Sequence, residues 1–200
     1  MANGRILIGF SFPMVALYTN NQGVAGYSGL MPLARGVSNT LSPEVSDENI
    51  FRADNMNAES AGGILTGGTV TPTVDGLKEE AKRMIFGLPA ASTIQVDGED
   101  VQELQYGEAA KPPYVGYGFV EKYQEDGEIS YVGRVFTKIK FHYSDETANT
   151  QGTDIEWQTR ELAADLFRDD TAAHNWQRES YPLDTEEEAV AYVQTVLGGV

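Results

Sequence analysis

Residues 114–143, YVGYGFVEKYQEDGEISYVGRVFTKIKFHY, carry the clearest structural pattern in the chain. Before residue 120, large side chains alternate with glycines, and Glu125-Asp126-Gly127-Glu128 is a typical hairpin turn sequence. After the turn, apolar or small residues recur at every second position from Ile129 to Tyr143. Because successive side chains of a strand point to opposite faces, this period predicts a long antiparallel hairpin.

The second strand of the hairpin is predicted to be half-buried. Its apolar face carries Ile129, Tyr131, Gly133, Val135, Thr137, Ile139, Phe141 and Tyr143. Its more polar face carries Ser130, Val132, Arg134, Phe136, Lys138, Lys140 and His142. Most strands have five or six residues, whereas this one spans about 15, a length that suits extended hairpins in assemblies.

A returning strand is predicted after a polar loop over residues 144–152. From Thr153 to Arg160, apolar and polar residues alternate again. If the chain folds back around residue 148, Asp154 comes opposite His142 and Glu156 comes opposite Lys140. Opposite charges on facing positions stabilise strand pairing by about 0.2–1 kcal/mol each, which supports this register.

Two helices are predicted. The first covers Asp75–Phe86, with Asp75 as its N-cap and Gly87 as the left-handed residue that ends it. The second covers residues 183–198, where Thr185 and Glu188 form a capping box before an apolar stripe.

The first third of the chain lacks helix signals. Residues Thr19–Gly63 are rich in turn residues, which predicts a long irregular arm of the kind that often binds partners. Inside it, residues 45–58 fit a strand, a tight turn around Ala53-Asp54-Asn55 and a returning strand. Residues 63–74 are rich in Thr and Val and predict a further strand, whereas residues 97–113 are simply polar.

The length of 200 residues fits one large domain or two small ones, and a single acidic domain over residues 1–200 is expected. The chain has 14 basic and 30 acidic residues, a net charge of −16 and no cysteine. Tight nucleic-acid binding depends on Lys and Arg, so it is not expected. Disulfides and thiolate zinc sites are excluded. No stretch approaches the roughly 18 apolar residues of a membrane span, so no membrane partner is expected.

Sequence motifs of catalysis are absent. There is no Gly-x-Ser-x-Gly and no P-loop. His142 and His174 are interpreted as solvated or structural, because neither has a second ligand at metal-binding spacing. Residues 97–100 (DGED) lack the alternating ligand spacing of a calcium loop. We therefore expect no enzyme, no metal and no cofactor. A hydrolase with two acidic residues stays an alternative, since such a pair is defined only in space.

The basic residues Arg134, Lys138 and Lys140 have two interpretations. They could form a patch for a polyanion, or they could be cross-strand partners of Asp154 and Glu156. The second interpretation is favoured, because the acidic residues are predicted to lie opposite them.

The order of elements resembles the major tail protein, or tail tube protein, of long-tailed bacteriophages. The similarity is greatest to phages with non-contractile tails that infect Gram-positive hosts. It rests on the long N-terminal arm, the turn at Ala53-Asp54-Asn55, the Thr-rich strand and the helix closed by Phe86-Gly87-Leu88. The aromatic hairpin over 114–143 and the acidic tail that ends in a helix complete it, so the resemblance covers most of the chain.

The resemblance implies a mainly β fold (α+β): a β-sandwich or β-barrel core with one flanking helix, long loops and a C-terminal helix. It also implies hexameric rings of this chain, stacked into a tube through which DNA passes without tight binding. The tape measure, tail terminator and distal tail proteins would be further partners. The protein would be made in the cytoplasm of the bacterial host and reside in the virion tail, and the family has no catalytic residues to transfer.

Residues expected to matter for structure or assembly come from the arm, the helix end and the hairpin strands. They are Asp54, Asn55, Gly87, Tyr117, Phe119, Tyr131, Arg134, Lys138, Lys140, Asp154 and Glu156. A carbohydrate-binding or capsid-decoration β-sandwich is the alternative function. In it, exposed aromatic residues such as Trp157 and Trp176 would form a sugar platform.

Overall fold

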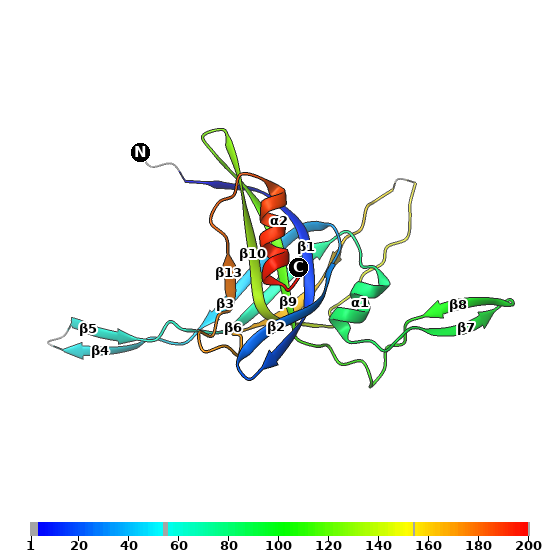
Figure 1. The fold of residues 1–200 in the computed structure, drawn as a ribbon, viewed down its shortest axis with the longest axis horizontal. Coiled ribbons are helices and arrows are strands. Elements are labelled where there is room, and N and C mark those ends of the chain that lie inside the picture. Colours follow the sequence, from blue (N-terminus) through cyan, green and yellow to red (C-terminus); the bar gives the residue numbers. More distant parts are fainter. Residues whose placement is uncertain (1–3, 54–55, 154, 200) are drawn as a thin grey trace.

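The computed structural model describes residues 4–53, 56–153 and 155–199, and their fold is mainly β, as expected. A nine-stranded antiparallel sheet has the order β11-β6-β12-β10-β9-β1-β2, with β3 also pairing with β6 and β13 with β10 (Figure 1). Its strands are β1 (Ile6–Asn21), β2 (Val24–Pro32), β3 (Gly36–Val45), β6 (Leu65–Val74), β9 (Val115–Glu125), β10 (Glu128–His142), β11 (Arg160–Glu161), β12 (Ala163–Phe167) and β13 (Gln177–Glu179).

The main hydrophobic core joins one face of this sheet to helix α1 (Glu79–Phe86). Four buried rings lie at its centre, with centroid separations of 5.5–6.4 Å, and they belong to Tyr117, Phe119, Phe136 and Phe141. Such aromatic pairs contribute about 0.5–1.5 kcal/mol beyond simple burial. Two of the expected residues, Tyr117 and Phe119, are therefore parts of the core.

A second, smaller core lies on the opposite face of the sheet, under helix α2 (Glu186–Val196). Val193 and Leu197 of the helix region pack there against Met14 and Val135. Glycines on β9 and β10 allow the helix to approach closely. A Cβ at Gly133 would lie 2.7 Å from Tyr192 Cδ1 and 2.8 Å from the Ala189 carbonyl oxygen.

The prediction that one face of β10 is apolar along its whole length is wrong. The pairing of β10 with β9 shifts register between Phe136 and Ile139. Before this irregularity, Phe136 faces the main core and Val135 faces α2, whereas after it Ile139 and Phe141 face the main core. An extra residue in a strand reverses which positions point inward. The predicted basic stripe is therefore divided between two faces.

The hairpin and the helix ends were predicted more accurately. Strands β9 and β10 meet at Asp126 and Gly127, which have φ values of 50° and 91°. Helix α2 has the predicted capping box at Thr185. Helix α1 ends at Gly87, with φ 61° and ψ 39° as expected, but it begins at Glu79, so Asp75 is not its N-cap. Asp75 instead binds Arg35, before the start of the helix.

The predicted irregular arm at 19–63 consists mostly of strands, which corrects that expectation. It contains the end of β1, then β2 and β3, and then β4 (Asn49–Ala53) paired with β5 (Met56–Ala61). Regular pairing of β3 with β6 supplies backbone hydrogen bonds despite the many turn-forming residues. Strands β4 and β5 agree with the predicted turn at Ala53-Asp54-Asn55, although Asp54 and Asn55 themselves lie outside the described residues.

A hairpin also occupies part of the segment described above only as polar. Strand β7 (Ser92–Val96) pairs with β8 (Glu99–Glu103). The turn between them has φ values of 51° at Asp97 and 87° at Gly98, which is the geometry that Asp-Gly favours in two-residue hairpin turns. The Asp-Gly dipeptide after the alternating residues 93–96 was the signal for this hairpin.

The strand predicted at 153–160 is also wrong. Among its described residues Arg160 alone pairs, and together with Glu161 it forms β11. The strand that returns along β10 is β12, with Lys140 opposite Asp165 and His142 opposite Ala163. Alternation alone did not identify the partner, because β12 has only five residues. Glu156 lies outside any strand and is exposed, and Asp154 lies outside the described residues.

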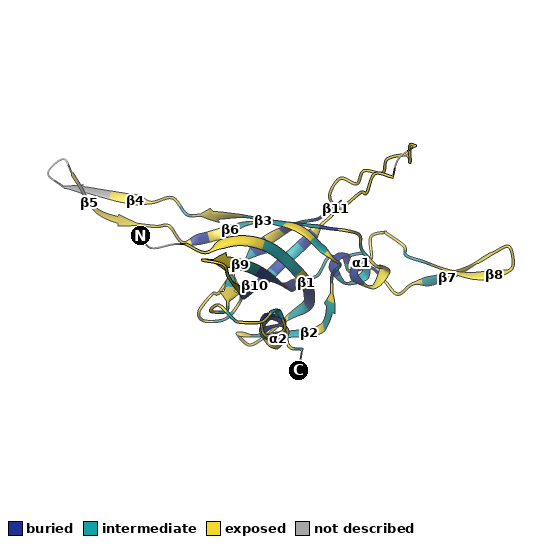
Figure 2. Cartoon of the chain, turned by 90° about the horizontal axis from the view of Figure 1, so that it is seen from above, coloured by how far each residue is buried: buried dark blue, intermediate teal, exposed yellow. Residues whose placement is uncertain are grey.

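Three exposed segments extend away from the sheet (Figures 1 and 2). They are the β4–β5 hairpin, the β7–β8 hairpin and the connection formed by residues 144–153 and 155–159. Figure 2 shows that buried residues concentrate in the sheet and helices, while these extensions are almost entirely exposed. Within the described part of the chain, neither helix is long and apolar enough to cross a membrane.

Candidate functional site

The structure gives no sign of a metal centre in the part of the chain that it describes. No group of three or more His, Asp or Glu side chains is placed to hold a metal ion there. His142 lies 3.8 Å from Asp165, and His174 Nδ1 lies 3.2 Å from the backbone oxygen of Asp169. Both histidines therefore have local structural contacts, and the candidate functional features are exposed surfaces and pockets.

Arg134 belongs to a half-buried ionic cluster on β9, β10 and β13. Its guanidinium lies 3.1 Å from Glu121 and 3.3 Å from Glu179. Glu121 is only 7% exposed and also accepts a 2.6 Å hydrogen bond from the Tyr123 hydroxyl. Burial, followed by this hydrogen bond, raises the pKa of Tyr123 to about 12. Glu121 and Glu179 are therefore the partners of Arg134, and their charges offset that of its guanidinium.

Lys138 belongs to a different cluster, on the other face of the bulged strand. Its Nζ lies 2.8 Å from Asp170 Oδ2 and within 5.2 Å of the ring centroids of Tyr18 and Tyr114. The Tyr18 hydroxyl donates a 3.0 Å hydrogen bond to the same carboxylate. The bond from Lys138 is the main reason that the pKa of Asp170 lies below its usual value. Lys140 lies 5.6 Å from the Tyr114 ring.

The basic residues therefore do not form one polyanion patch. Arg134 and Lys138 each have carboxylate partners, as the favoured interpretation held, but those partners are not Asp154 and Glu156. Sequence reasoning missed Glu179 and Asp170 because they come from segments whose pairing with β10 was not predicted. It also missed Glu121, although this residue lies on β9, the predicted partner strand of β10. The Asp169-Asp170 pair was a visible signal, but only the fold brings it to Lys138.

The remaining expected residues are structural. Tyr131 is half-buried, with Lys122 Nζ 5.7 Å from its ring, and its backbone exchanges hydrogen bonds of 2.9 and 2.8 Å with Leu183. Gly87 adopts the left-handed conformation, and a Cβ there would overlap the backbone of Lys111. Gly87 ends helix α1, and Tyr131 joins β10 to the segment that precedes α2.

Apolar side chains are exposed on the extensions. On the β7–β8 hairpin, Ile94 pairs with Val101, and these two side chains are 42% and 41% exposed. On the β4–β5 hairpin, Met56 is 69% exposed. Trp157 is 90% exposed, whereas Trp176 packs against the main core, so the two tryptophans have different environments. Exposed apolar groups of this kind often mark contact surfaces.

A groove beside β1 adds another apolar surface. It has a volume of about 700 Å³ and is lined in part by Phe12, Met31, Leu33 and Ala81. Phe12 is 52% exposed and has φ 51°, a conformation that is strained for a bulky side chain. Such strain is often retained where a side chain has a function.

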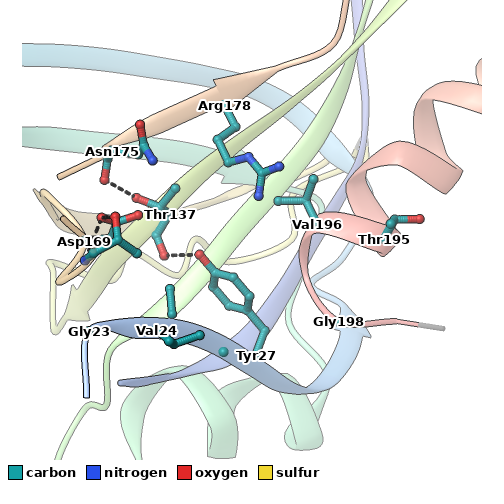
Figure 3. Close-up of a pocket in the computed structure, with 13 residues that line it drawn as sticks. Gly23, Val24, Tyr27, Thr137, Asp169, Asn175, Arg178, Thr195, Val196 and Gly198 are labelled. Carbon is teal, nitrogen blue, oxygen red and sulfur yellow. Dashed lines mark hydrogen bonds between the residues drawn. The ribbon is translucent and has the colours of Figure 1, made fainter. Parts of the chain in front are cut away.

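A polar pocket lies between β2, the end of α2 and the segment around residues 169–178 (Figure 3). Its volume is about 420 Å³. The Tyr27 hydroxyl donates a 2.9 Å hydrogen bond to the Thr137 carbonyl, and the Thr137 hydroxyl donates one of 2.7 Å to the Asn175 carbonyl. Asp169 and Arg178 bring opposite charges to its lining. The pocket can therefore offer both polar and apolar contacts.

No protein-family model matches the sequence, and no curated protein is similar to it. The fold and the exposed surfaces are therefore the basis for inferring a function. The exposed apolar extensions point to protein contacts, and the polar pocket points to a small ligand or side chain.

Proposed function

We propose that this chain is a structural virion protein, the major tail tube subunit of a long-tailed bacteriophage. In this proposal, six copies form a ring, and stacked rings form the conduit for DNA. The order of elements resembles that family, and the mainly β core with a flanking helix agrees with what the resemblance implies. Other tail proteins would contact the ends and lumen of the tube.

One observation carries the proposal: two isolated hairpins project from a well-packed core (Figure 1). Each of the hairpins β4–β5 and β7–β8 forms its own two-stranded sheet. A two-stranded hairpin is only marginally stable in water unless another surface covers it. Contacts with neighbouring subunits would cover the exposed apolar residues on both.

The acidic composition is compatible with a conduit. A ring of six subunits would carry six times the net charge of −16. Carboxylates facing a lumen would repel the phosphate backbone and prevent DNA from adhering. A conduit needs passage more than affinity, so the charge that disfavours tight binding supports this role.

The test is direct observation of assembly. The purified chain is concentrated, with and without a phage tail initiator complex, and examined by light scattering and negative-stain electron microscopy. We expect rings, or tubes whose wall is about one subunit thick. Monomers alone under every condition, including with the initiator, would contradict the proposal.

A matched pair of variants tests the role of the β7–β8 hairpin. Val101→Glu places a charge on the apolar face, beside Ile94, whereas Gln102→Glu adds the same charge to the opposite face. We expect Val101→Glu to abolish assembly and Gln102→Glu to retain it. Circular dichroism should show folded monomers for both. Equal assembly by the two variants would remove this hairpin from the interface.

A further inference from the structure

The pocket of Figure 3 contains a buried carboxylate without a cationic partner. Asp169 is only 4% exposed. Both hydrogen bonds to its side chain reach Oδ1, from the backbone N–H of Thr171 at 3.1 Å and from the Thr171 hydroxyl at 2.6 Å. Among the described residues, no Lys, Arg or His forms a salt bridge with it.

Asp170, the next residue in the chain, differs from Asp169 because its carboxylate has a cationic partner. Asp170 binds Lys138 and Tyr18, which occupy its carboxylate on the side of β1 and β10. Asp169 points to a separate environment, because it lines the pocket together with Tyr27 and Thr137. A buried charge is costly unless it is paired, so Asp169 is a site where an external cation would gain a strong partner.

Other groups around the pocket also favour positive charge. The end of α2 contributes Thr195, Val196 and Gly198 to the lining, and the C-terminal end of a helix carries partial negative charge. The last turn of α2 has no basic residue to offset it. Burial, and then the charge of Asp169, raise the pKa of the Tyr27 hydroxyl, which therefore stays neutral at physiological pH.

One positive group faces the same pocket. Arg178 comes from β13 and is exposed. In Figure 3 it lies across the pocket from Asp169. Its charge opposes cation binding, and this makes it a useful probe of the site.

We propose that this pocket binds an organic cation, a primary ammonium group, through the carboxylate of Asp169. The Tyr27 ring and Val196 provide the surface for the alkyl part of the ligand. The cation belongs either to a free amine or to a basic side chain of a peptide. The lining of this site includes no residue of the projecting hairpins.

The test is titration calorimetry of the full chain in buffer at physiological salt. Two probes separate the sources: butylammonium chloride as a free amine, and the capped peptide acetyl-Gly-Lys-Gly-amide as a lysine side chain. Saturable binding of either probe is expected, and the tighter one identifies the source. If neither probe binds, the proposal is wrong.

Three variants locate the binding. Asp169→Asn keeps an oxygen that can accept from Thr171 and should weaken binding about tenfold or more. Glu187→Gln removes the same charge from the exposed first turn of α2 and should leave affinity unchanged. Arg178→Gln should tighten binding, because it removes the opposing charge. Weaker binding in Arg178→Gln would show instead a site for ligands of both charges and overturn the cation assignment.

Discussion

Glycines under α2 determine how closely this helix approaches the sheet. At Gly133, an added Cβ would meet Tyr192 and the backbone of Ala189 at less than 3 Å. We predict that Gly133→Ala lowers the free energy of unfolding by about 1–3 kcal/mol, because the helix must move outward. Urea unfolding measures the loss. Gly152→Ala is the control, because nothing lies within 4 Å of its Cβ position, and it should change stability by less than about 0.5 kcal/mol.

A second residue-scale prediction concerns pH. The bond with Lys138 lowers the folded-state pKa of Asp170 below its usual value. A carboxyl group with a lowered pKa stabilises the fold above its unfolded pKa and loses that contribution as pH falls through the folded value. The wild type should therefore be more stable than Asp170→Asn at neutral pH. We expect the difference in urea midpoint to shrink steadily below about pH 4. A constant difference at all pH values would contradict this role of the ion pair.

At the scale of elements, two glycines in similar turns have different surroundings. Gly127 joins β9 to β10 inside the large sheet, whereas Gly98 joins the isolated strands β7 and β8. Both have positive φ, 91° and 87°, and neither has an atom within 4 Å of its Cβ position. Alanine is strained at such angles and costs about 1 kcal/mol.

We predict that Gly127→Ala lowers the global free energy of unfolding by about that amount, while Gly98→Ala leaves it unchanged. Amide hydrogen exchange should instead show faster exchange at 92–103 in Gly98→Ala. Global destabilisation by Gly98→Ala would mean that the β7–β8 hairpin unfolds together with the core.

The elements that the sequence predicts well are those with local signals. The Asp126-Gly127 turn and the Thr185–Glu188 capping box depend on residues within a few positions of each other. The bulge in β10 is evident only from its register with β9, and the pairing with β12 joins segments that are separated along the chain. Alternation alone therefore assigned the wrong faces and the wrong returning strand. The sequence predicted that Arg134 and Lys138 pair with carboxylates, but it did not identify which carboxylates.

At the scale of the whole molecule, the composition predicted acidity, and the fold shows where apolar surface remains exposed. No sequence pattern placed the pocket around Asp169, because it is formed by β2, the end of α2 and a loop that meet only in the folded chain. The projecting hairpins can likewise be recognised only from their position relative to the core (Figure 2). Because both features depend on the whole fold, their experiments use the full chain.

The net charge of −16 also predicts how the proposed assembly depends on salt. Bringing like-charged subunits together costs electrostatic free energy, and salt screens it over a Debye length of about 8 Å at physiological ionic strength. We therefore expect the concentration needed for ring or tube formation to fall as sodium chloride is raised from roughly 0.01 to 0.15 M. Light scattering at several protein concentrations measures this threshold. Val101→Glu should remain monomeric across the same range, because screening does not restore its apolar contact. A threshold that rises with salt would mean that attraction between opposite charges, and not apolar contact, drives the assembly.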